Sequence, residues 1–148
     1  MSSADIQLIS DKLHIRELID KYSNICTQRL WDGFSGLFAE NCAWRTRGAT
    51  QRDIVGAQEV VKAIRGVVEG CQMVFQMPHA PVIEIDGDRA ISSVLMNEVI
   101  KLDDASGRMM FGIYRDRLVR TPDGWKFEER VFNLVYSEPI SMTGRLFG

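Results

Sequence analysis

The chain is poor in the residues from which metal sites and disulfide frameworks are built. Its 148 residues include three cysteines and two histidines, and no two cysteines stand close together in the sequence. An odd, widely spaced set of cysteines does not make a disulfide framework, and the spacing matches no zinc-binding motif. We therefore expect no metal site, and free thiols that pack as small hydrophobic side chains at Cys26, Cys42 and Cys71.

Long apolar segments and clustered positive charge are also missing. No apolar run approaches the roughly 18 residues that a membrane-spanning helix needs. The N-terminus does not show the charged and then apolar pattern of a secretion signal, so we expect a cytoplasmic protein with no membrane partner. The formal net charge is −2, and the basic residues are scattered along the chain. A nucleic-acid partner is therefore not expected.

The short motifs of several large enzyme classes are absent as well. The sequence contains neither GxGxxG nor GxxxxGK[ST], the glycine-rich loops that hold phosphate groups. It also contains no GxSxG motif and no cysteine–histidine pair suited to acyl transfer. Nucleotide-dependent chemistry and acyl transfer of these types are therefore not supported.

What the sequence does contain is a series of four strand-like segments between Met73 and Tyr136. Aromatic and β-branched residues are frequent in them, and three turn signals separate them: Asp86–Asp88, Asp103–Gly107 and Thr121–Gly124. Asp-Gly pairs between such segments predict hairpins, because glycine adopts positive φ angles without steric cost. Connections this short require antiparallel neighbours, so we predict an antiparallel meander long enough to twist and curl. A curled sheet has a concave face that is either filled or available to a ligand.

The N-terminal part of the chain is predicted to be helical. Apolar residues recur at steps of three and four between Ile15 and Cys26, which predicts a helix that ends near Leu30. Residues 1–5 give no evidence of order, and Asp11 could cap a break within this helix. Asp32 is expected to cap a short helix that follows.

Two short strands and a second long helix come next. The strands are predicted at 42–48 and 51–55, and the helix from Ala57 to about Gly70, where an apolar stripe repeats at helical spacing. Helices followed by an antiparallel sheet indicate an α+β domain. No linker or internal repeat divides residues 1–148, so we predict a single domain with the first helix lying across the concave face of the sheet.

Four segments together resemble the SnoaL-like branch of the nuclear-transport-factor-two-like superfamily. They are Ile15–Tyr22, Trp31–Trp44, Ile83–Ala90, and Gly112–Asp116 followed by Asp123–Phe127, and they span nearly the whole chain in the expected order. The resemblance implies a cone-shaped α+β barrel of the cystatin-like type around one deep apolar pocket. It also implies cofactor-independent lyase, isomerase or cyclase chemistry, as in scytalone dehydratase-like and polyketide cyclase-like members. The same superfamily includes binding proteins that are not enzymes.

The resemblance also implies a proton-carrying aspartate near the end of the first helix and a histidine on the strand before the Ile83–Ala90 hairpin. This sequence has Thr27 and Gln76 at those positions. His79 lies three residues beyond Gln76, and a bulge at Pro78 could turn it into the pocket, because proline interrupts a strand ladder. Without a bulge, positions 76 and 79 face opposite sides of the strand. His79 is thus either a candidate for proton transfer near neutral pH or an edge residue bonded to backbone.

Glu98 is the second candidate for proton transfer. It follows Ser92, Val94 and Met96 at strand spacing, so these side chains share one face, which the resemblance places inward. A carboxylate that faces an apolar cavity has a raised pKa and can act as a base. The alternative is a position on a solvated outer face.

Arginine and tyrosine side chains complete the predicted site. Arg130 matches an inward-facing arginine of the family, and it could stabilise a developing negative charge or form a structural ion pair with Glu98 or Asp116. Tyr22 and Tyr114 can donate hydrogen bonds to a substrate oxygen, although buried tyrosines usually bond within the core. The predicted catalytic residues are His79, Glu98, Tyr22 and Arg130, and the predicted substrate contacts are Tyr114, Trp44, Thr27, Gln76, Met96, Met110 and Phe132.

Two functions remain open at the level of the sequence. The first is a cofactor-independent lyase or isomerase with dehydratase-like acid–base chemistry on a small hydrophobic oxygenated ring compound. The second is a non-catalytic binding protein that keeps the pocket but lacks the aspartate–histidine pair. Apolar residues in the tail at 137–148 predict that it packs over the pocket or on a neighbouring subunit, in a homo-oligomer such as a dimer or trimer.

Overall fold

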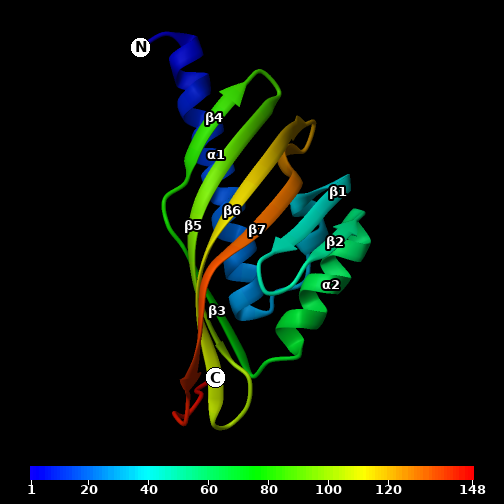
Figure 1. The fold of residues 1–148 in the computed structure, drawn as a ribbon. Coiled ribbons are helices and arrows are strands. Elements are labelled where there is room, and N and C mark those ends of the chain that lie inside the picture. The colour runs from blue at the N-terminus through cyan, green and yellow to red at the C-terminus, as the bar shows by residue number, and fades with distance from the viewer.

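A curved β-sheet and two helices make up the computed structural model, which describes residues 1–148 (Figure 1). Helix α1 runs behind the sheet along its length, and α2 lies beside the short strands β1 and β2. From the N-terminus the elements are α1 (Ser3–Gln28), the 3₁₀ helix η1 (Phe34–Leu37), β1 (Phe38–Arg47), β2 (Arg52–Val55), α2 (Ala57–Glu69), β3 (Met73–Pro78), β4 (Val82–Asp86), β5 (Arg89–Lys101), β6 (Ser106–Thr121) and β7 (Gly124–Ser141).

The sheet has the strand order β2-β1-β7-β6-β5-β3, and β4 also pairs with β5. The predicted antiparallel meander is confirmed, except that its first strand is two strands, β3 and β4, separated at residues 79–81. One pair, β1 with β7, is parallel, so the sheet is mixed rather than wholly antiparallel. Its edge strands β2 and β3 do not pair with each other, and the sheet is curved but open. The α+β class and the cone-like curvature are as predicted.

Two irregularities in the pairing of β6 with β7 help to bend the sheet. The register shifts between Phe111 and Gly112 and again between Arg117 and Leu118, with the extra residue on β7 each time. Such bulges increase the local twist and turn a long strand pair.

Along β5 the side chains alternate as predicted: Val94 and Met96 are buried, and Leu95 between them is exposed.

The first helix starts earlier than the sequence pattern predicted. The Ser2 hydroxyl accepts a hydrogen bond from the Asp5 amide, and the Asp5 carboxylate accepts one from the Ser2 amide, which is a complete capping box. The expectation that residues 1–5 lack order is therefore wrong. The predicted cap at Asp32 is also wrong, because Gly33, in the left-handed region with φ of 80°, occupies the position before η1.

Asp11 does not interrupt α1, contrary to the prediction. Its buried carboxylate accepts a hydrogen bond from Trp125 Nε1 at 3.0 Å and two from Arg120, at 2.6 Å and 2.8 Å. The Arg120 hydrogen bonds lower the pKa of Asp11 to about 2. An acid in the middle of the helix thus fastens α1 to the end of the β6–β7 hairpin.

The last strand extends into the segment predicted as a tail. β7 pairs with β6 as far as Ser141, and the Met142 amide donates a hydrogen bond to the Ala105 carbonyl at 2.8 Å. Residues beyond Met142 form no helix or strand, and Phe147 is 84% exposed. Packing of this tail over the pocket or on a neighbouring subunit stays a prediction.

The core lies between the concave face of the sheet and the buried faces of α1 and α2. It contains 22 buried hydrophobic residues, among them Ile15, Ile19 and Cys26 of α1 and Val60 and Ile64 of α2. All three cysteines are free, as predicted, with Cys71 only partly buried. Neither helix is long and apolar enough to cross a lipid bilayer.

Candidate active site

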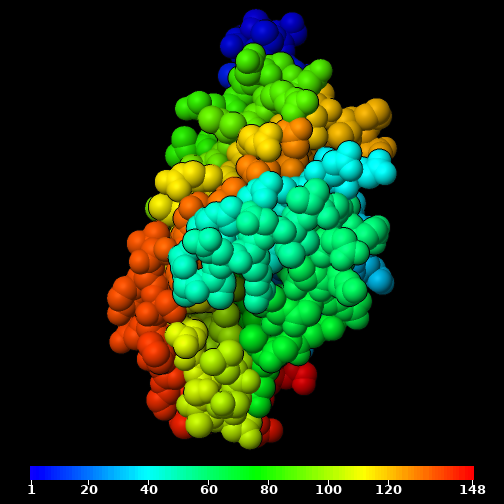
Figure 2. All heavy atoms as spheres, turned by 45° about the vertical axis from the view of Figure 1, so that its right-hand side comes forward, coloured from blue at the N-terminus to red at the C-terminus, as the bar shows by residue number.

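A pocket of about 380 Å³ lies between the concave face of the sheet and a cover formed by α2 and the β1–β2 connection. Figure 2 shows this side of the molecule, with the cyan β1–β2 connection and green α2 next to the yellow and orange strands β6 and β7. Twelve of the 20 residues that line the pocket are hydrophobic. A volume of this size holds a small ring compound with its apolar surface out of water.

Two tyrosines, one from α1 and one from β6, contribute the innermost hydroxyl groups. The hydroxyls of Tyr22 and Tyr114 lie 3.2 Å apart, and both side chains line the pocket while almost fully buried. Burial raises the pKa of Tyr22 well above its ordinary value and that of Tyr114 to about 12, so both phenols keep their protons at neutral pH. One of the two hydroxyl hydrogens joins the pair, and the other is free to bond a ligand oxygen.

Arg130 supports this tyrosine pair from behind and does not line the pocket. Its guanidinium group is fully buried and bonds Asp116 at 2.8 Å and 3.3 Å, while Ser92 donates to the same carboxylate at 3.0 Å. It also stacks against the rings of Tyr22 and Tyr114, at 4.3 Å and 3.8 Å from their centroids. Burial works against the charged form of Arg130, but the interactions with Asp116, Tyr114 and Tyr22 together outweigh it and raise the pKa of Arg130. Of the two predicted roles, the structure shows the ion pair with Asp116.

Glu98 is the one acidic side chain of the pocket lining. It points inward from β5, as predicted, and its Oε1 accepts a single hydrogen bond, from Gln76 Nε2 at 3.3 Å. Burial raises the pKa of Glu98 to about 7, and the Gln76 bond limits this rise. No arginine or lysine pairs with this carboxyl group, so it can take up or release a proton near neutral pH.

The two residues found in place of the expected aspartate and histidine bond to each other. The backbone amide of Gln76 donates to Thr27 Oγ1 at 3.0 Å, which joins the end of α1 to β3. Gln76 lines the pocket, whereas Thr27 lies behind it. The Oε1 atom of Gln76 is buried and has no hydrogen-bond partner.

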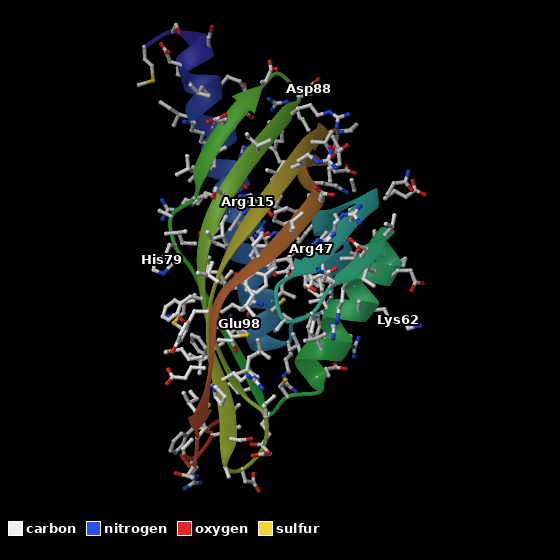
Figure 3. The ribbon with its side chains drawn as sticks, in the orientation of Figure 1. Arg47, Lys62, His79, Asp88, Glu98 and Arg115 are labelled. Atoms are coloured by element: carbon white, nitrogen blue, oxygen red, sulfur yellow. The ribbon has the colours of Figure 1, made fainter.

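His79, one of the predicted catalytic residues, does not line the pocket. It follows Pro78, where β3 ends and the chain leaves the sheet, and its backbone amide bonds the Leu95 carbonyl at 2.9 Å. The side chain is exposed, and Figure 3 places it at the outer margin of the sheet, whereas Glu98 lies nearer the middle. The structure therefore matches the alternative of an edge histidine held through backbone, and it separates His79 from the other predicted catalytic residues.

The walls of the pocket are apolar. Trp44, Met110 and Phe132 line it as predicted, whereas Met96 is buried in the core and does not reach it. Gly112 lies directly against the Phe132 ring, and a Cβ atom at this position would collide with the ring. The absence of a side chain at Gly112 thus allows Phe132 to lie close to the sheet.

Sequence reasoning missed the basic residues at the mouth of the pocket. Arg47, Arg52 and Arg108 all belong to its lining, from the ends of β1, β2 and β6. Strand alternation places Arg108 on the same face as Met110 and offered a signal for it, but no local pattern identifies Arg52. No group of three or more histidine, cysteine, aspartate or glutamate side chains is placed to hold a metal ion.

Comparison with known proteins identifies the family of this chain. The family model of the SnoaL-like domain matches residues 7–131. The chain belongs to the SnoaL-like domain family. A relative of Mycobacterium tuberculosis, the uncharacterized protein Rv2910c, is 31% identical over 135 residues, which cover 88% of this chain and 89% of the relative.

Solved structures of other proteins share the SnoaL-like fold at low sequence identity. The hexachlorocyclohexane dehydrochlorinase LinA-type3 of Novosphingobium barchaimii has a TM-score of 0.82 and 14% identity, covering 92% of this chain and 94% of that protein. A candidate scytalone dehydratase of Novosphingobium aromaticivorans has a TM-score of 0.79 and 16% identity, covering 91% and 90%. An NTF2-like protein of the same species with a cystatin-like fold has a TM-score of 0.76 and 19% identity, covering 90% and 87%. At these identities the likeness establishes the fold.

Proposed function

We propose that this SnoaL-like protein is a lyase or isomerase that moves protons with its own side chains on a small hydrophobic oxygenated ring compound. The proposal is carried by the position of Glu98, whose largely buried carboxyl group lies on the wall of an apolar pocket and has a pKa of about 7. A base whose pKa lies near the working pH transfers protons efficiently. Two proteins that share the fold bear the names dehydrochlorinase and dehydratase, and both names denote elimination reactions.

In the proposed reaction Glu98 removes a proton from a carbon next to a carbonyl group. The electrons of the broken C–H bond move onto the carbonyl oxygen, where the free hydroxyl hydrogen of the Tyr22–Tyr114 pair stabilises the charge. When the carbonyl re-forms, a hydroxyl group on the adjacent carbon leaves with the proton from Glu98, which gives dehydration. Return of the proton to another carbon gives a double-bond shift. Arg130 acts as a positioning residue, because it holds both tyrosine rings without reaching the pocket.

Proton abstraction can be tested without the natural substrate. The protein is incubated in D₂O at pH 8 with 2-tetralone, a bicyclic ketone, and α-deuteration is followed by NMR. We expect exchange above the buffer rate, and Glu98→Gln should reduce the protein-dependent rate about 100-fold or more. The matched control is Glu84→Gln on β4, an exposed position that should keep the wild-type rate. Exchange that is unchanged in Glu98→Gln would rule out the assigned base.

A binding protein is the second candidate, and one observation favours it. Thr27 and Gln76 stand where the family resemblance implies a proton-carrying pair, and their mutual hydrogen bond is a structural one. A binding protein would show no exchange above buffer with any ketone of this size. It would also bind ring compounds equally well in the wild type and in Glu98→Gln.

A further inference from the structure

The mouth of the pocket is positively charged, in contrast to the chain as a whole. The protein has 18 basic and 20 acidic residues, yet three arginines and only one acid line the pocket. The acid, Glu98, is largely buried, whereas Arg52 and Arg108 are exposed and therefore mark the opening. The pocket is thus apolar along its walls and cationic at its entrance.

The three arginines differ in what they bind. Arg47 is engaged within the protein: it bonds Asp53 at 2.7 Å and the carbonyls of Thr46 and Arg52 at 2.8 Å and 3.1 Å. Arg52 and Arg108 take part in none of the ion pairs of the chain, which lie elsewhere. Neither donates a side-chain hydrogen bond. Two guanidinium groups at one opening are therefore free for an external anion.

The position of these two arginines suits a ligand with one charged end. Arg108 shares the concave face of β6 with Met110, so its side chain continues the lining outward from the apolar wall. Arg52 starts β2, on the connection that covers the pocket. Guanidinium groups bind the planar oxygens of carboxylates and the oxygens of phosphates through paired hydrogen bonds.

We propose that the ligand of this pocket carries an anionic group, a carboxylate or a phosphate, and that Arg52 and Arg108 bind this group at the mouth while the ring lies against the apolar walls. The inference rests on the proposed function in one respect, since it orients the ring with its reacting carbon toward Glu98. The anion itself is a property of the mouth and can be measured without turnover.

The test is calorimetric titration at pH 7.5 and low salt with three probes that share one ring system: 2-naphthoate, 2-naphthyl phosphate and the neutral 2-naphthamide. One partly exposed ion pair is worth up to about fivefold in affinity, so two arginines predict about a tenfold preference for an anionic probe. The double variant Arg52→Met/Arg108→Met should lose this preference and keep its affinity for 2-naphthamide within about twofold. Comparison of the two anionic probes shows whether the mouth favours a carboxylate or a phosphate.

Arg115→Met is the matched control, because Arg115 lies on β6 like Arg108 but is exposed on the opposite face of the sheet (Figure 3). This variant should keep the wild-type preference. The inference would be overturned if the wild type bound charged and neutral probes equally well or bound neither anion. It would also be overturned if the preference for anions survived in the double variant, or if Arg115→Met lost it to the same extent. If anion preference is absent while exchange still depends on Glu98, the inference fails and the proposed function stands. If the anion preference is present but exchange does not depend on Glu98, the anion site is supported and the proposed catalytic function fails.

Discussion

Replacement of Glu98 by glutamine should change how the stability of the protein depends on pH. The pKa of Glu98 is about 7 in the folded protein, against an ordinary value of 4.5 that applies to the unfolded chain. Below pH 4.5 the carboxyl group is protonated in both states and contributes no pH dependence. Between the two values the folded state keeps the proton and the unfolded state releases it, so unfolding becomes more favourable as the pH rises. Above pH 7 both states are ionised and the effect is complete.

The size of this effect follows from the two pKa values. Each pH unit between them removes about 1.4 kcal/mol, so the wild type should lose about 3 kcal/mol relative to Glu98→Gln between pH 4.5 and pH 7. This is a large share of the roughly 5–15 kcal/mol by which a domain is stable. Urea unfolding of both proteins at half-unit pH steps measures the difference, and Glu84→Gln, on the exposed side of β4, serves as the control. A difference that stays constant to within about 1 kcal/mol over this range would refute the buried, near-neutral carboxyl group.

Three further predictions concern the groups around the pocket. Arg130→Met should lower the free energy of unfolding by about 3–5 kcal/mol, because it leaves the Asp116 carboxylate buried without its partner; a second change, Asp116→Leu, should recover most of this loss in urea unfolding. Tyr114→Phe removes the hydrogen bond between the two tyrosine hydroxyls and should cost about 1 kcal/mol of stability. It should also slow the α-deuteration of 2-tetralone about 100-fold, and an unchanged rate would show that the pair does not bond the substrate oxygen. Asp11→Asn should cost about 1–2 kcal/mol at pH 7, because the carboxylate contribution is present above pH 3.8 and is lost as the pH falls through about 2; equal stability of wild type and variant at pH 7 would contradict it.

The sequence contained enough to predict the sheet and one wall of the pocket. Side chains in a strand alternate strictly between two faces, so the spacing from Ser92 to Glu98 identified the inward set on β5 once one member was assigned. The same rule placed Tyr114 on the concave face of β6. Turn residues fixed where the meander reverses. These are local properties, and a single sequence records them directly.

The errors concern long-range geometry. The sequence marks Pro78 as an irregular position. Whether the chain bulges inward there or leaves the sheet depends on the strands packed beside it. In the structure β3 ends at Pro78 and the His79 side chain lies outside the pocket. Asp11 looked like a cap because its partners, Arg120 and Trp125, lie more than one hundred residues away. Arg52 reaches the pocket mouth because the β1–β2 connection folds over the sheet, which no local pattern predicts.

Gly112 makes the capacity of the pocket easy to change. Any larger residue at this position would displace the Phe132 ring, and the space in front of that ring is the space a guest would occupy. One substitution, to alanine, would therefore narrow the range of acceptable guests without replacing any proton-transferring or charged group. Proteins built on this scaffold can in this way diverge in the size of molecule they accept without rebuilding their chemistry.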